Sequence, residues 1–374
     1  MINLFEPHVS QSSLDLLQEV FLSKWLGRGA NAVEFERRLT ELLRTDLSKV
    51  HTIANCTDAI FGAFEVLGIT PGKEVIVPSI SFPAVGSAIL AAGLTPKIID
   101  IDLESGNIDL DLVVDALSSK TAAIFVTHYG GIPVDIKRLR KLVGSDIFII
   151  EDAACALGTY INGVACGTEG DFGCWSFDAM KLLTCGEGGA IYVANSERMI
   201  HAKEYFYLGL PAQAKSGIDR QATDSRWWEY QLKTPGRRSI FTNINAAIGL
   251  PQFGELPVAL DRRRTIRAYY CEVLDKCDVK YLRQDDPNVI YSNYFYTVVT
   301  DRRDELASFL KKNQIYSTFR YYPLHLINLF QSYADDCSAA TDFSNTALNI
   351  PIHQSLSDMD VEHIANTLRL FFSR

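Results

Sequence analysis

The sequence predicts an α/β protein with a mostly parallel central sheet, and two observations lead to this fold class. Short apolar runs occur at residues 74–78, 95–100, 122–127, 146–150, 172–176 and 189–193, and helical patterns separate most of them. This alternation is typical of a doubly wound sheet flanked by helices. The chain has 374 residues, of which 47% are apolar, which is enough for one large core and a smaller one.

These elements predict two domains. The large domain spans residues 12–250. Beyond it, residues 258–273 predict a long basic helix, and 291–299, 315–322 and a helix after Ser357 indicate a smaller α/β domain over residues 251–374. We expect residues 1–11 to pack on this smaller domain.

The first functional candidate is the turn between a strand at 50–54 and a helix that starts within 55–64. A helix N-terminus presents free N–H groups and the positive end of the helix dipole, which suit a phosphate. Thr57 and Asp58 also favour helix starts when no anion binds, so the turn alone leaves both interpretations open.

The strand at 75–78 ends in a turn that carries one aromatic residue, Phe82. Its ring is suited to stacking on a flat cofactor ring without a polar group to satisfy. Most phenylalanines belong to the core, and that alternative stays open for Phe82 taken alone.

Two carboxylates, Glu151 and Asp152, follow the apolar run at 146–150. This is the pattern of a buried parallel strand whose C-terminal end lies at a functional site. Asp152 is therefore a candidate for chemistry. The alternative is that it caps the next helix.

Lys181 is the most informative residue, in the segment 175–189 between two short buried strands. An amine attacks a carbonyl only when unprotonated, and its ordinary pKa of about 10.4 must be lowered, for which burial is the expected cause. The segment predicts a Schiff base with an aldehyde cofactor, and pyridoxal phosphate is the leading candidate. Asp152 would then keep the pyridine nitrogen protonated, so that the ring accepts electrons from the substrate. The alternative is a solvated loop lysine.

Together these segments resemble the DegT family of pyridoxal-phosphate sugar aminotransferases, which has the aspartate-aminotransferase-like fold type I. The likeness runs over nearly the whole chain. Its landmarks are residues 33–36, 55–59, 67–78, 97–102, 151–154, 176–177 with Lys181, 186–189 and 246–250. The resemblance implies a large domain with a mostly parallel sheet, a smaller C-terminal domain and a homodimer that shares its active sites.

The resemblance also implies roles for individual residues. Lys181 would carry the cofactor and later move the proton between the substrate carbon and the cofactor. Asp152 would pair with the pyridine nitrogen, and Phe82 would stack on the ring. The phosphate would be held by Cys56, Thr57 and Ser176.

Three positions depart from the family pattern. The family commonly has glycine where Cys56 stands, and glutamine near the ring hydroxyl where Cys155 stands. Arg238 occupies the place of an asparagine that reaches the phosphate of the neighbouring subunit, and an arginine would add charge there. The stretch 220–238 otherwise departs from the usual sequence.

For the reaction, the resemblance implies transfer of an amino group from L-glutamate to a nucleotide-linked 4-keto-6-deoxyhexose, for a surface polysaccharide such as O-antigen or a glycosylated metabolite. Glu187 favours C4 over C3, because relatives acting at C3 often have aspartate there. Arg320 and His325 are further substrate-binding candidates. Amination at C3 and amination of a keto-cyclitol remain alternatives.

Two other classes fit less well. A sugar dehydratase of this family typically has histidine in place of Lys181, and a non-catalytic regulator would not require both Lys181 and Asp152. A dinucleotide-dependent hydride-transfer enzyme is disfavoured, since no G-x-G-x-x-G opens a helix after the early strands.

Composition sets the remaining expectations. The net charge of −9 argues against nucleic-acid binding, which needs a basic face. Local basic candidates for an anionic ligand are Arg237, Arg238, Arg262, Arg263, Arg264 and Arg320, although residues 262–264 favour a solvated helix face. Eight cysteines without a regular framework indicate reduced thiols.

The expected location and metal content depend on signal, membrane-spanning and metal-ligand patterns that the sequence lacks. The N-terminus lacks a basic-then-apolar signal, and no apolar run is long enough to span a membrane, so we expect a cytoplasmic enzyme. His128, His325 and His353 lack ligand spacing, so no metal site is expected.

Overall fold

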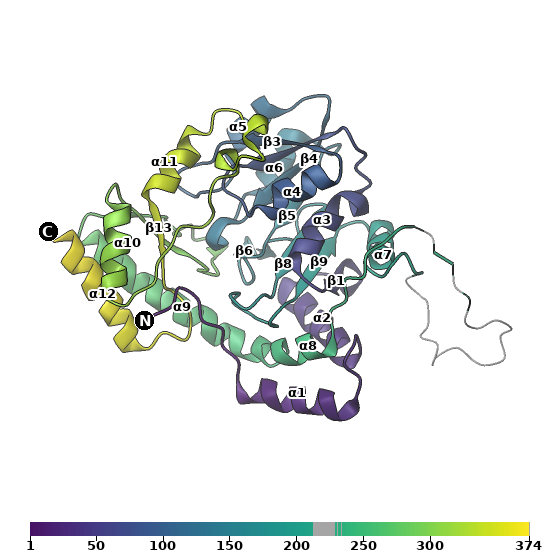
Figure 1. Ribbon diagram of the computed structural model, residues 1–374, viewed down its shortest axis with the longest axis horizontal. Helices are drawn as coiled ribbons and strands as arrows, with labels where there is room; N and C mark the ends of the chain where they lie inside the picture. Colours follow the sequence, from purple (N-terminus) through teal and green to yellow (C-terminus); the bar gives the residue numbers. More distant parts are fainter. Residues whose placement is uncertain (212–228, 230, 233, 374) are drawn as a thin grey trace.

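The computed structural model describes residues 1–211, 229, 231–232 and 234–373. A seven-stranded sheet forms its centre, with strand order β1-β9-β8-β5-β4-β2-β3 (Figure 1). β9 is antiparallel to both of its neighbours, and the other adjacent strands are parallel. The strands are β1 (Val50–Ile53), β2 (Glu74–Pro78), β3 (Thr95–Ile99), β4 (Thr121–Thr127), β5 (Phe148–Asp152), β8 (Phe172–Ser176) and β9 (Gly189–Val193). The predicted α/β fold class is confirmed.

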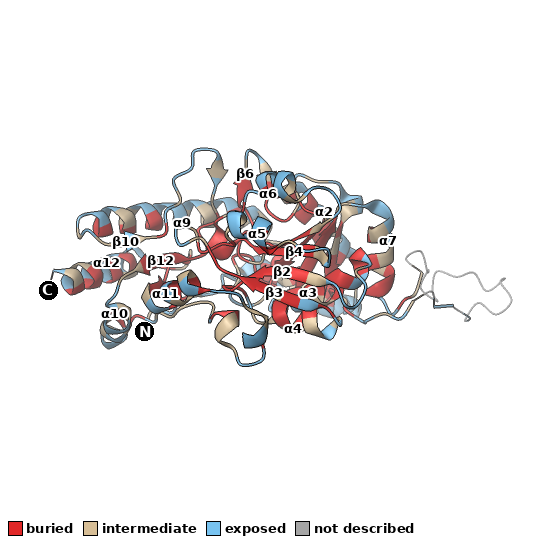
Figure 2. Cartoon of the chain, turned by 90° about the horizontal axis from the view of Figure 1, so that it is seen from above, coloured by how far each residue is buried: buried red, intermediate tan, exposed pale blue. Residues whose placement is uncertain are grey.

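Helices cover both faces of this sheet, so its central strands are buried (Figure 2). Side chains alternate along β2: Val75 and Val77 join the core beneath α3 and α4, whereas Ile76 joins the core beneath α5 and α6. The helices of this part are α1 (Gln11–Ser23), α2 (Ala30–Leu43), α3 (Cys56–Leu67), α4 (Ala84–Ala91), α5 (Leu110–Ala116), α6 (Ile136–Val143), α7 (Ser196–Tyr205) and α8 (Asn243–Gly249). Short 3₁₀ helices are η1 (Leu47–Lys49) and η2 (Tyr129–Gly131).

The C-terminal part has a three-stranded antiparallel sheet and an apolar core between that sheet and its helices. The strands are β10 (Lys280–Tyr281), β12 (Tyr296–Val299) and β13 (Ala347–Ile350), and the helices are α9 (Gln252–Asp275), α10 (Arg303–Lys312), η3 (Leu324–Leu326), η4 (Gln331–Tyr333), α11 (Ser338–Thr346) and α12 (Asp358–Phe372). A third, small sheet joins β11 (Val289–Ile290), β6 (Tyr160–Ile161) and β7 (Val164–Ala165). The expected domain boundary at residue 250 stays a prediction.

The N-terminal residues contact this C-terminal part. The N–H of Ile2 donates to the carbonyl of Gln314 at 2.7 Å, and His353 Nε2 lies 3.1 Å from the carbonyl oxygen of Asn3. Leu4 is buried.

Two local expectations differ from the structure. Residues 315–322 form no regular strand. In this segment Ile315 pairs with Ile2 and Thr318 pairs with Asn349, each as an isolated bridge. The predicted solvated face at residues 262–264 is wrong for Arg263, which is buried and hydrogen-bonded to Gln354 Oε1. Burial lowers the pKa of Arg263 to about 10. In the part of the chain that the structure describes, no helix has the length and hydrophobicity to cross a membrane.

Candidate active site

Asp152 is the last residue of β5, at the edge where the parallel strands end. It pairs in register with Cys174 of β8. The residue is 4% exposed, and its Oδ1 accepts a hydrogen bond from the N–H of Ala154 at 2.9 Å. Burial raises the pKa of Asp152, because a carboxylate loses solvation in the interior. A cationic donor on the ligand side would relieve this cost, and a protonated pyridine nitrogen is such a donor.

Lys181 lies in the loop between β8 and β9, whose two ends are tied together. The N–H of Phe177 donates to the carbonyl of Gly188 at 2.9 Å, and the N–H of Cys185 donates to the carbonyl of Phe177 at 2.8 Å. The structure brings Lys181 and Asp152 together, since the lysine is near enough to oppose the rise in the pKa of Asp152.

The surroundings of Lys181 reverse the expected effect of burial. Its Nζ lies 3.7 Å from Cys155 Sγ and 4.9 Å from the centre of the Tyr294 ring. Burial disfavours the ammonium ion, but attraction to Cys155, Tyr294 and Tyr321, which acts once these groups ionise, outweighs it and raises the pKa of Lys181 well above its ordinary value. Burial therefore acts on this pKa in the expected direction, but the net pKa of the unliganded lysine is raised and not lowered.

Tyr294 and Tyr321 complete the wall around Lys181, and sequence reasoning missed both. Burial raises the pKa of Tyr294 to about 12 and that of Tyr321 well above its ordinary value, so both phenols are protonated at neutral pH. The Tyr321 hydroxyl lies 3.9 Å from Cys155 Sγ. Only the fold brings these residues to a lysine more than 100 positions earlier, and no sequence signal marks them among 16 tyrosines.

The first turn of α3 lies beside the ends of β8 and β9. Gly189 of β9 pairs with Ser176 of β8 on one side and with Ile53 of β1 on the other. A Cβ atom at Gly189 would lie 2.5 Å from the backbone carbon of Asn55 and 2.6 Å from the nitrogen of Cys56, so this approach requires glycine. The Asn55 side chain caps the helix by accepting from the N–H of Asp58 at 2.8 Å.

This arrangement fits a phosphate group. Helix α3 supplies free N–H groups and the positive end of its dipole, and Ser176 supplies a hydroxyl from the neighbouring strand end. Thr57 is exposed in the first turn, and Cys56 is buried beside it. The structure therefore groups Cys56, Thr57 and Ser176 as expected, while their roles stay predictions.

Phe82 and Arg320 lie near the entrance to this region. Phe82 is 43% exposed, and its ring makes an edge contact with Tyr321 at a centroid distance of 5.6 Å. The Arg320 Nη2 lies 3.5 Å from Met180 Sδ, next to Lys181 in sequence, and its guanidinium lies over Phe5. Both residues are accessible to a ligand.

The remaining candidates are less closely tied to Lys181. Both ring nitrogens of His325 have partners, Ser79 Oγ at 2.5 Å and Thr341 Oγ1 at 2.9 Å, so the ring is held by the protein. Glu187 and Arg238 are exposed, and Arg238 lies over the Tyr207 ring. Much of the stretch 220–238 lies outside the described residues.

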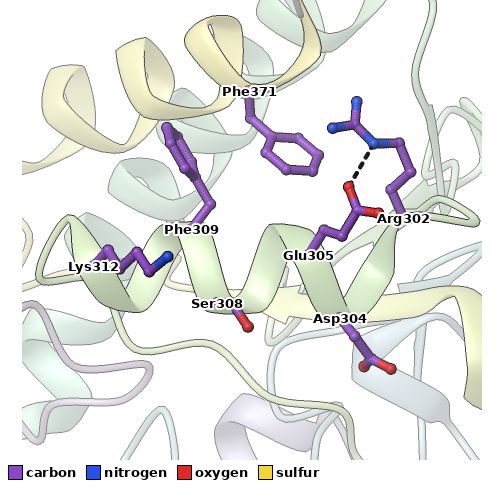
Figure 3. Close-up of a pocket in the computed structure, with 7 residues that line it drawn as sticks. All are labelled: Arg302, Asp304, Glu305, Ser308, Phe309, Lys312 and Phe371. Carbon is purple, nitrogen blue, oxygen red and sulfur yellow. Dashed lines mark hydrogen bonds and ion pairs between the residues drawn. The ribbon is translucent and has the colours of Figure 1, made fainter.

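A pocket on the surface lies away from this region, between α10 and the end of α12 (Figure 3). Arg302 and Glu305 form an ion pair across it, and Phe309 and Phe371 provide its apolar wall. Lys312 and Ser308 line the rest. None of the candidate cofactor residues belongs to this pocket.

A model of the DegT/DnrJ/EryC1/StrS aminotransferase family matches residues 7–369. The chain belongs to this family. The family resemblance is therefore confirmed over nearly the whole chain, and the protein is a pyridoxal-phosphate-dependent aminotransferase.

Individual proteins that are similar to this chain are also aminotransferases. The chain is 36% identical over 372 residues to dTDP-4-dehydro-2,3,6-trideoxy-D-glucose 4-aminotransferase of Saccharopolyspora spinosa, covering 98% of this chain and 95% of that protein. It is also 36% identical to the crystal structure of the aminotransferase TlmJ from Streptoalloteichus hindustanus, with a TM-score of 0.92 and coverage of 100% and 99%. The PLP-form of the putative sugar aminotransferase Spr1654 from Streptococcus pneumoniae matches at 26% identity, a TM-score of 0.88 and coverage of 99% and 98%.

Proposed function

We propose that this enzyme transfers an amino group from L-glutamate to C4 of a nucleotide-linked 4-keto-6-deoxy sugar. The observation that carries the reaction type is the position of Lys181 beside the buried carboxylate of Asp152, next to the N-terminus of α3. The preference for C4 is supported by Glu187 and by the similarity to the Saccharopolyspora enzyme, a 4-aminotransferase.

The proposed roles are those that the family resemblance implies, and the positions of the side chains support them. When bound, pyridoxal phosphate supplies an aldehyde for the amino group and a ring that accepts electrons. Lys181 Nζ holds the cofactor and then moves a proton to or from the substrate carbon, a general acid–base role. The Asp152 carboxylate accepts a hydrogen bond from the pyridine nitrogen and stabilises its positive charge.

Other residues position the two ligands. Phe82 stacks on the ring, and Ser176 with the first turn of α3 binds the phosphate. The Cys155 thiol lies beside Lys181 Nζ and the Tyr321 hydroxyl lies beside that thiol, and both limit the access of water in this proposal. Glu187, Arg320 and His325 face the sugar nucleotide in this proposal.

The assembly is proposed to be a homodimer in which Arg238 reaches the partner's phosphate site. Apolar side chains lie exposed on α1 and just after it, at Leu14, Phe21, Leu22, Trp25 and Leu26, and a second subunit would cover them. Light scattering should give twice the chain mass. Arg238→Ala should weaken cofactor retention, while Arg283→Ala, which removes an exposed 3.8 Å pair with Asp285, serves as its control. A monomer that is fully active would contradict the shared site.

The expected cytoplasmic location stays a prediction.

The reaction is tested by product analysis. The purified enzyme is incubated with L-glutamate and a panel of nucleotide-linked 3-keto and 4-keto sugars, and NMR locates nitrogen in each product. We expect nitrogen at C4. Nitrogen only at C3, amination of a keto-cyclitol instead, or loss of a hydroxyl group without amination would each overturn the assignment.

A further inference from the structure

Two thiols and a carboxylate meet beneath the candidate cofactor site. Cys56 is the first residue of α3, Asp152 ends β5, and Cys174 lies in β8. One ligand atom from each, two sulfurs and a carboxylate oxygen, lie within 4.8 Å of one another. The three residues are 8%, 4% and 0% exposed. Their wide separation in the sequence explains why ligand spacing gave no sign of this cluster.

The fold holds the three groups in place from two directions. Asp152 and Cys174 are register partners on adjacent parallel strands. Cys56 comes from α3, whose first turn is fixed by the Asn55 cap and by the close approach of Gly189. The two thiols lie close together, and the Cys56 thiol together with burial raises the pKa of Cys174 well above its ordinary value.

This ligand set matches a soft divalent cation. Zinc binds thiolate at about 2.3 Å and carboxylate oxygen at about 2.0–2.2 Å, usually with four ligands in a tetrahedron. In that geometry neighbouring ligand atoms lie about 3.4–3.8 Å apart, so the cluster needs to contract by only about 1 Å. Thiolate ligands favour zinc and cadmium over magnesium and calcium.

We propose that Cys56, Cys174 and Asp152 form a zinc-binding site that is available only while pyridoxal phosphate is absent. Zinc displaces the two thiol protons and takes three protein ligands, and water fills the fourth position. The exclusion rests on the proposed function, because Asp152 is also the partner of the pyridine nitrogen. Zinc binding itself rests only on the three side chains.

The full-length chain, reduced and freed of cofactor, is titrated with zinc by calorimetry, and bound metal is counted by elemental mass spectrometry. We expect one zinc ion per chain. Cys174→Ala should weaken zinc binding at least tenfold, and Cys337→Ala, which removes a buried thiol elsewhere, should leave it unchanged. Equal zinc affinity in Cys174→Ala and the unaltered protein would overturn the site.

Two further measurements keep the proposal testable if Cys174→Ala folds poorly. Cadmium added to the unaltered protein should produce thiolate-to-metal charge-transfer absorption, and its absence would overturn the proposal. Zinc should weaken pyridoxal-phosphate binding, followed by cofactor absorbance, at least tenfold, and the cofactor should weaken zinc binding by the same factor. Zinc and cofactor that bind together without interference would overturn the exclusion. The proposed function fails separately, through product analysis in metal-free buffer.

Discussion

The cofactor side and the substrate side of this site are built in different ways. Asp152 and Ser176 end paired strands and are 4% and 8% exposed, whereas Arg320, Tyr321 and Tyr322 follow an irregular backbone, and Tyr322 is 59% exposed. Backbone hydrogen bonds between strands fix Asp152 and Ser176, because a one-residue change of register in either strand would disturb its pairing along the sheet. Loop residues can change without that cost. In the proposed function, the strand ends therefore hold the cofactor and the loop contributes to the choice of sugar.

The largest expected effect comes from removing Lys181. Lys181→Ala should lower turnover by at least about 10²–10⁴-fold, the usual contribution of a general acid–base group, while the fold is retained. Borohydride reduction followed by peptide mass spectrometry should locate the cofactor at residue 181 in the unaltered protein and not in the variant. Lys137→Ala, on the exposed side of α6, serves as the control. Labelling at another lysine in the fully loaded protein would contradict the assignment.

Glu151, near the end of β5, should stabilise the folded protein. Glu151 Oε2 lies 2.9 Å from His128 Nε2, and the Glu151 carboxylate also accepts N–H groups from Gly167 and Gly170. Although burial opposes ionisation, these donors lower the pKa of Glu151. Glu151→Gln should therefore cost about 2–5 kcal/mol of unfolding free energy, because a neutral amide replaces a buried carboxylate and cannot accept all of these hydrogen bonds.

The pH dependence gives this prediction a sign. Because the folded-state pKa of Glu151 is depressed, its stabilising effect is complete above its ordinary value of 4.5 and is lost as the pH falls below it. In urea unfolding, the gap between Glu151→Gln and the unaltered protein should be largest near neutral pH and should shrink below pH 4.5. A gap that grows on acidification would contradict a stabilising role of the Glu151 carboxylate.

Asp152 should matter for the cofactor more than for the fold. Asp152→Asn keeps the shape and removes the charge, so cofactor affinity should fall about 10–100-fold, equivalent to the 1.5–3 kcal/mol of a hydrogen bond to a charged group. Burial raises the pKa of Asp152, so the ionised carboxylate contributes no stability of its own to the unliganded protein, and its unfolding free energy should not fall. Asp146→Asn, exposed before β5, is the control. Equal cofactor affinity in both variants would place the pyridine nitrogen elsewhere.

The smallest effect is expected on the loop side. The Arg320 side chain is accessible, and among the described residues it has a weak contact with Met180 and lies over the ring of Phe5. Arg320→Ala should therefore raise KM for the sugar nucleotide a few-fold, in line with about 1 kcal/mol for an exposed charge. The kcat value should change less than KM. Steady-state kinetics with Arg303→Ala as control separate the two. A large fall in kcat with unchanged KM would indicate that Arg320 takes part in the chemical step, and it would contradict the proposed division between strand ends and loop.

Most of the strand side was predictable from the sequence, because buried parallel strands are continuous apolar runs. The run at 146–150 indicated β5, although the ladder continues through Glu151 and Asp152, since Asp152 still pairs with Cys174. The loop side was less predictable. Residues 315–322 have an apolar pattern that predicted a strand, but their backbone makes only isolated bridges.

Side chains that depend on long-range contacts were the least predictable. Tyr294 and Tyr321 reach Lys181 only through the fold, and no periodicity marks them. Arg263 has the same local sequence context as its exposed neighbour Arg264, yet carbonyl oxygens and Gln354 compensate for its burial. Pattern alone cannot distinguish two adjacent arginines when the partner of one is about 90 residues away.

The closed loop that carries Lys181 has a mechanical consequence. Two backbone hydrogen bonds at Phe177 restrain the main chain of this loop, so the amine moves mainly by rotation about its own carbon–carbon bonds. If Lys181 transfers the proton as proposed, its reach is set by its four methylene groups. Binding and release of reactants then need no rearrangement of the platform that bears the nitrogen.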